Sequence, residues 1–76
     1  MRGPRRYEIG VGDDLREHAR TKDEAFDLAR REARRSRNED DGHAYVFDVM
    51  ARVGAPDLWL VDREGNARVL KTKGIR

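Results

Sequence analysis

Apolar and polar residues alternate near the start of the chain. In the stretch "YEIGV", Tyr7, Ile9 and Val11 alternate with a glutamate and a glycine. A period of two is typical of a strand with one buried face. We therefore predict a strand over residues 7–11, followed by a turn. The next stretch, residues 15–19, alternates only weakly, and fits either a short second strand or an irregular connection.

A helix is predicted from residue 22 to residue 35 or 37. Thr21 and Glu24 have the spacing of a capping box, in which each side chain accepts a hydrogen bond from the backbone N–H of the other residue. Acidic residues come early in this segment and basic residues late, which complements the helix dipole. The pair Asp27–Arg31 adds i,i+4 spacing. One side is apolar and mostly small, as suits packing on a sheet. Its members are Ala25, Phe26, Leu28, Ala29 and Ala33.

Three further strands are predicted after the helix. The stretch "HAYVFDVMARV", residues 43–53, is the longest and most apolar, so we expect it at the centre of the sheet. After a "GAP" turn, residues 57–61 and 67–72 form a hairpin around the turn at residues 62–66. The whole pattern predicts an α+β fold of order β-α-β-β-β. Its four-stranded, mainly antiparallel sheet would have one helix packed on one face.

The predicted domain covers residues 7–76, with residues 1–6 as a flexible basic arm. The connection from the first strand through the helix should be a right-handed crossover. The chain contains nothing to cover the second sheet face, which we expect to carry Val46, Asp48 and Met50.

Trp59 can lie on either face, because it alternates with leucines on both sides. We favour a buried or half-buried position, because a small core needs its largest side chain. In the other orientation, Trp59 joins the open face together with Leu70. The predicted protein-binding surface is therefore Val46, Asp48, Met50 and Trp59.

Composition narrows the function classes. The chain has 76 residues, of which 42% are charged, and a formal net charge of +2. A chain this short holds one thin core and no deep cleft with a cofactor. It has no cysteine, which excludes disulfides and thiolate zinc sites. No apolar run approaches the length of a membrane span, and no apolar signal-peptide core follows the basic start. We expect a cytoplasmic protein with no membrane partner.

Candidate catalytic groups are sparse. His18 and His43 lack metal-ligand spacing, and a pairing of His43 with Asp48 is a weaker hypothesis than a solvated histidine at a strand start. The G-x-G at residues 10–12 is not followed by a helix start, as a phosphate loop requires. We therefore expect no enzymatic activity, no cofactor, no metal and no small-molecule substrate.

Arginine supports an alternative function, accessory nucleic-acid binding. Arg30, Arg34 and Arg37 fall on one helix stripe, and Arg5 and Arg6 could extend a phosphate-binding footprint. An acidic run after the helix and the lack of an aromatic platform argue against this alternative. The excess of arginine over lysine is also typical of chains from high-GC bacteria.

Two stretches carry a resemblance. "RTKDEAFDLARREA", followed later by "NARVLKTKG", resembles a family of short bacterial domains of unknown function, in which a strand leads to a Thr-capped helix and a basic C-terminal hairpin. "VFDVMARVGAPDLW" is similar to a segment of small uncharacterised proteins from actinobacteria and their phages. The resemblance implies a fold and a bacterial or phage origin, with no active site. The favoured function is a non-enzymatic protein-interaction or adaptor module whose partner is another protein or a second copy.

Overall fold

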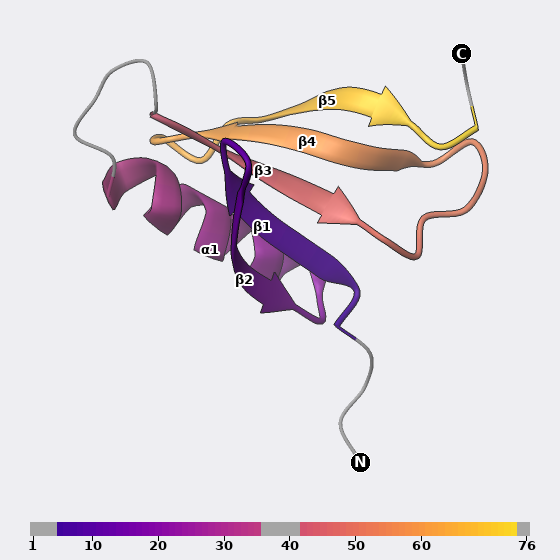
Figure 1. The fold of residues 1–76 in the computed structure, drawn as a ribbon. Helices are drawn as coiled ribbons and strands as arrows, with labels where there is room; N and C mark the ends of the chain where they lie inside the picture. The colour runs from indigo at the N-terminus through magenta and orange to yellow at the C-terminus, as the bar shows by residue number, and fades with distance from the viewer. Residues whose placement is uncertain (1–4, 36–41, 75–76) are drawn as a thin grey trace.

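Five strands and one helix form the domain in this computed structural model, which describes residues 5–35 and 42–74. The elements are β1 (Tyr7–Val11), β2 (Asp14–Ala19), α1 (Lys22–Arg35), β3 (His43–Asp48), β4 (Pro56–Asp62) and β5 (Ala67–Thr72). The strands form one sheet of order β2-β1-β3-β4-β5, and each neighbouring pair is antiparallel. α1 lies across one face of this sheet (Figure 1). The α+β class is confirmed, with five strands instead of four.

The additional strand is β2, so the stretch at residues 15–19 is a strand and not an irregular connection. It pairs with β1 from Tyr7–Ala19 to Val11–Asp14, with one irregularity between Ile9 and Gly10. β2 reverses the chain before the helix begins, so β3 runs antiparallel to β1. The expected crossover from the first strand through the helix is therefore wrong, because α1 connects β2 to β3.

The helix has the predicted start. The Glu24 N–H donates to Thr21 Oγ1 at 3.2 Å, and the Ala25 N–H donates to the Thr21 carbonyl at 3.0 Å. Arg31 Nη2 lies 3.1 Å from Asp27 Oδ2, so the i,i+4 ion pair also forms. Local sequence therefore determines where this helix begins.

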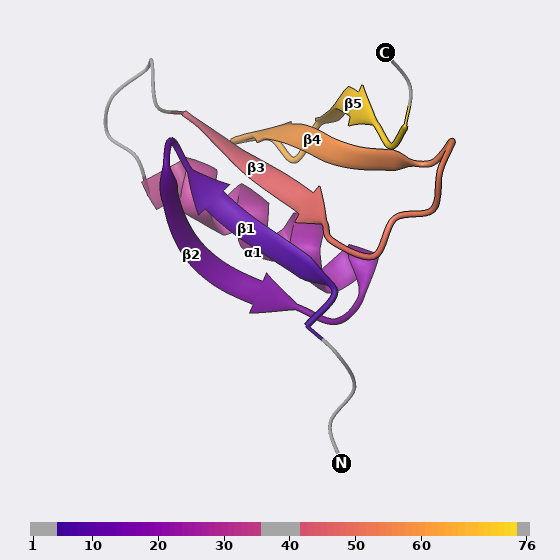
Figure 2. The same ribbon diagram turned by 45° about the vertical axis from the view of Figure 1, so that its right-hand side comes forward.

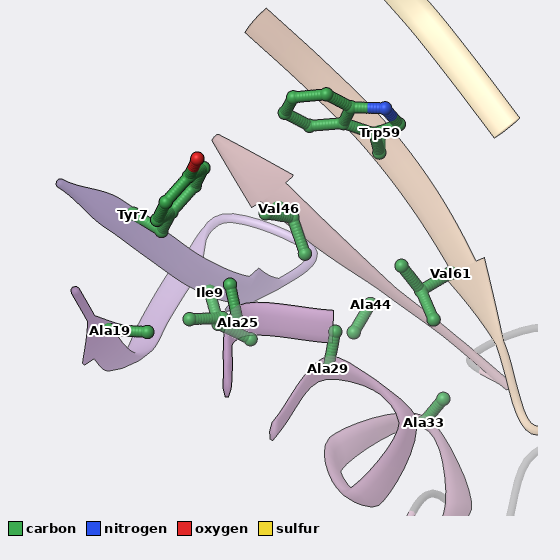
Figure 3. Packing of buried hydrophobic residues seen from close by; sticks show 10 residues of the cluster. All are labelled: Tyr7, Ile9, Ala19, Ala25, Ala29, Ala33, Ala44, Val46, Trp59 and Val61. Atoms are coloured by element: carbon green, nitrogen blue, oxygen red, sulfur yellow. The ribbon is translucent and has the colours of Figure 1, made fainter. Parts of the chain in front are cut away.

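The core lies between α1 and the sheet, and three alanines of the helix form one side of it. Ala25, Ala29 and Ala33 are fully buried and lie over the strands that carry Ile9 and Val46 (Figure 3). Small side chains allow the helix to approach the sheet closely, and little volume is left to fill.

Trp59 closes one end of this core. Its exposed fraction is 6%, and its ring packs edge-on against Phe26 with centroids 5.5 Å apart. Lys22 Nζ lies 5.3 Å from the centroid of the Trp59 ring, at a distance typical of a cation–π contact. The interpretation of Trp59 as a core residue is confirmed.

β3 is the central strand, as predicted, but it ends at Asp48 instead of continuing to residue 53. The Met50 N–H donates to Asp48 Oδ1 at 3.0 Å, and the Ala51 N–H donates to the Asp48 carbonyl at 3.3 Å. An aspartate that binds the backbone two residues later turns the chain. Asp48 therefore ends the strand.

Candidate functional site

The sheet face opposite α1 carries four large apolar side chains, and no other element of the described residues covers it (Figure 2). Tyr45 lies opposite Leu60, and Phe47 lies opposite Leu58, on the adjacent strands β3 and β4. The exposed fraction of Phe47 is 37%, and the other three are half-buried. We call this surface the open face.

A hollow of about 420 Å³ is lined by three of these side chains, Tyr45, Phe47 and Leu58. Gly10 forms its floor, because Gly10 lies opposite Tyr45 and has no side chain. Leu15 lines the far side. A Cβ atom at Gly10 would lie 2.9 Å from the Asp14 carbonyl oxygen, which belongs to the backbone and cannot swing away. The glycine therefore allows the close β1–β2 approach and also leaves the hollow open.

The two flanks of the open face differ in charge. Glu8, Asp13 and Asp14 line the hollow on the β1–β2 side. Arg16 Nη2 lies 3.5 Å from Asp14 Oδ2 and offsets part of this negative charge. On the opposite flank, Arg68 of β5 pairs with Leu60 of β4. The face thus has an acidic flank beside β2, an apolar middle, and Arg68 together with Asp62 on the opposite flank.

Three of the four residues in the predicted protein-binding surface are not on this face. Val46, Asp48 and Trp59 point toward α1 and have exposed fractions of 0%, 5% and 6%. The predicted place of Val46 and Asp48 on the open face is wrong, because β3 turns its even-numbered residues toward the helix. Trp59 takes the buried one of its two predicted orientations. Met50 is exposed, at 51%, but lies in the turn after β3.

Asp48 has a structural partner in Arg6. Arg6 Nε and Nη2 donate to Asp48 Oδ1 and Oδ2, both at 3.0 Å. Burial raises the pKa of Asp48, but the hydrogen bonds from Arg6 and from the Met50 N–H outweigh it, and the pKa is lower than usual. The same hydrogen bond raises the pKa of Arg6. Arg6, predicted to lie in the flexible arm, therefore belongs to the folded domain.

The two faces of β3 also separate His43 from Asp48. His43 shares the open-face side of β3 with Tyr45 and Phe47, whereas Asp48 lies on the helix side. The hypothetical acid–base pair of these two residues is not formed.

The helix arginines of the nucleic-acid alternative contact the protein itself. Arg30 Nη2 lies 3.1 Å from Asp27 Oδ1, and Arg34 Nε donates to the Arg63 carbonyl at 2.9 Å. Arg63 Nε in turn donates to the Ala33 carbonyl at 3.2 Å. These contacts fasten the end of α1 to the β4–β5 turn. Arg37 lies outside the described residues.

Arg5, the remaining arginine of that alternative, is exposed beside a second hollow of about 570 Å³. Its other polar lining residues are Arg16, Glu17, His18, Arg20 and Glu24. Two glutamates offset much of the positive charge there. The sequence offered no signal for this hollow, because Arg16 lies on β2 and Arg20 directly follows it, and β2 itself is only weakly indicated by the sequence.

Other kinds of site are not indicated in the part of the chain that the structure describes. No group of three or more histidine, aspartate or glutamate side chains is placed to hold a metal ion there. No helix among these residues is long and apolar enough to cross a membrane. No protein-family model, curated protein or solved structure matches this chain, so its own residues are the guide to what it does.

Proposed function

We propose that this chain is a small non-enzymatic protein-interaction module that binds another protein chain through its open face. The observation that supports this proposal is an uncovered apolar group on β3 and β4, formed by Tyr45, Phe47, Leu58 and Leu60. Contiguous apolar side chains surrounded by polar residues are typical of protein interfaces. Tyrosine and phenylalanine are also enriched at such surfaces.

Binding at a sheet edge fits the structure less well than binding at the face. Both edge strands, β2 and β5, are irregularly paired with their neighbours. They also carry exposed charges, among them Glu17 on β2 and Lys71 on β5. Irregular pairing and charged side chains are two ways in which proteins prevent strand addition at an edge.

Binding of nucleic acid also fits less well. Arg6, Arg30 and Arg34 are engaged in contacts within the domain. The aromatic rings of the open face adjoin a hollow with an acidic rim, which repels phosphate. A protein surface is therefore the better match for this face.

Leu60→Lys tests this proposal, because it places a charge at the centre of the open face. Val53→Lys is the matched control, because it also replaces an apolar side chain by lysine but does so away from the open face. Val53 is 80% exposed in the loop after β3. Each immobilised protein is incubated with a bacterial lysate, and the captured proteins are quantified by mass spectrometry. Circular dichroism checks that both variants fold.

We expect Leu60→Lys to reduce the amount of specifically captured protein at least tenfold. The captured protein is either a lysate protein or an added, tagged copy of this chain. Val53→Lys should retain both. Equal capture by all three proteins would contradict a role for the open face in binding.

A further inference from the structure

We propose that the occupant of the open face is a second copy of this chain, in a face-to-face dimer. The two-fold axis runs parallel to the strands and lies above β3. This inference rests on the proposed function, because it uses the same face. It adds the identity and the orientation of the partner.

The sheet order makes this arrangement self-matching. β3 has two strands on each side, with β1 and β2 on one side and β4 and β5 on the other. Rotation about an axis along the strands places β3 on its own copy, β1 on β4 and β2 on β5. A two-fold interface is formed by the same patch on both copies, so every contact occurs twice.

The shapes of the facing residues are complementary. Gly10, Tyr45 and Leu60 form one row across β1, β3 and β4. In the dimer, Leu60 of one copy faces Gly10 of the other, and its side chain enters the hollow of about 420 Å³. The Tyr45 rings of the two copies meet at the axis. Each copy thus supplies one projecting leucine and one vacant position.

The charges favour this orientation over its alternative. β5 of one copy lies over β2 of the other, which places Arg68 over Leu15 and beside Asp13 and Asp14 on the rim of the hollow. An in-plane axis perpendicular to the strands would instead place β5 on β5 and bring the two Arg68 side chains together. Opposite charges facing each other select the register of an interface, and like charges disfavour the wrong one.

The size of the face indicates a weak dimer. Five strands about 4.8 Å apart and about 20 Å long cover roughly 480 Å² per copy, or about 1,000 Å² in total. This is near the lower limit of specific interfaces, so we expect a dissociation constant on the order of 10 µM.

Sedimentation velocity of the full chain between about 1 µM and 1 mM measures this dimer. We expect the wild type and Val53→Lys to shift from monomer to dimer across this range. Leu60→Lys should weaken the dimer at least tenfold. A wild type that stays monomeric at 1 mM, or a dimer of unchanged strength in Leu60→Lys, would overturn the inference.

A charge exchange tests the orientation without altering the apolar residues. Arg68→Glu alone, and Asp13→Lys combined with Asp14→Lys, should each weaken self-association, because like charges then face each other. Mixing the two variant proteins should restore the dimer, because opposite charges face each other again at both ends. Mixing that gives no recovery overturns this orientation.

The two proposals fail in different ways. A monomeric wild type that still captures other proteins, with capture lost in Leu60→Lys, overturns the second copy as occupant and keeps the interaction module. A wild type that neither self-associates nor captures other proteins overturns both proposals.

Discussion

Arg6 and Asp48 are 42 residues apart in the sequence, and two hydrogen bonds of 3.0 Å join the guanidinium of the first to the carboxylate of the second. The pair connects the residue before β1 to the last residue of β3. Arg6 and Asp48, which the sequence predicts on two different binding surfaces, thus hold two strands together. Two parallel charge-assisted hydrogen bonds are among the stronger polar contacts in proteins.

Asp48→Ala should lower the free energy of unfolding by about 2 kcal/mol, because it removes charge-assisted hydrogen bonds at a buried position. Arg6→Ala should also lower it, since a buried carboxylate then loses its partner. Arg5→Ala, a change at the exposed neighbouring arginine, serves as the control. Urea unfolding measures all three. An Asp48→Ala protein as stable as the wild type would show that the pair contributes nothing to the fold.

Acid should destabilise the domain through two aspartates. The pKa of Asp48 is lowered by Arg6 and the Met50 N–H against the effect of burial, and the pKa of Asp62 is lowered first by the Asn66 N–H. Both aspartates therefore bind protons more readily in the unfolded chain, where an aspartate has its ordinary pKa of 3.8. Their contribution is complete above that value and is lost as the pH falls below it.

Urea midpoints measured between pH 6 and pH 2.5 check this pH dependence. The wild-type midpoint should fall steeply below about pH 4. The double variant Asp48→Asn with Asp62→Asn should start lower and show a shallower fall. Parallel curves for the two proteins would mean that other groups cause the acid sensitivity.

Asp57→Val should stabilise the domain by about 1 kcal/mol, because it removes a poorly compensated buried charge and places a β-branched residue in a strand. Asp57 is 2% exposed, its Oδ1 has no hydrogen-bond partner in the described residues, and the Lys71 Nζ lies 4.0 Å from its Oδ2. Thermal and urea unfolding at pH 7 measure the change. A loss of stability instead would show that the carboxylate has a partner that this geometry does not include.

Gly10→Ala should cost roughly 2 kcal/mol, because the added Cβ would lie 2.9 Å from the Asp14 carbonyl oxygen and force the strands apart. The free energy of unfolding gives the cost, and amide hydrogen exchange locates it. Faster exchange should be confined to the β1–β2 pair. An unchanged stability would mean that the irregular pairing of these strands relaxes freely.

Local signals could predict α1 but not β2. The hydroxyl of Thr21 and the spacing of Ala25 and Ala29 act within a few residues, so they mark the helix directly. β2 lies at the sheet edge with most of its side chains exposed, so its apolar and polar residues alternate only weakly. Only its pairing with β1 makes it a strand, and pairing is not visible in a short window of sequence.

The face that β3 turns to the helix could not be predicted for a different reason. Both of its sides are apolar, with Val46 on one and Tyr45 and Phe47 on the other. The side with the aspartate reads as the solvated one until Arg6 is known to neutralise Asp48. That contact joins residues that are far apart in the sequence and is not visible in a local pattern. The pattern therefore predicts the binding surface on the wrong side of the sheet.

The place of β3 at the centre of the sheet has a consequence for folding. The β1–β2 and β4–β5 hairpins each close within a short segment, whereas β3 pairs with both β1 and β4 and lies across from α1. The strands of the two hairpins are not hydrogen-bonded to each other, because β3 lies between them and pairs with both. β3 also pairs with β4 across a short loop, so the slow step is the distant pairing of β3 with β1. The pairing of β3 with β1 therefore joins the β1–β2 hairpin to the β3–β4–β5 strands in one cooperative unit, and both parts should unfold together when this pair is lost.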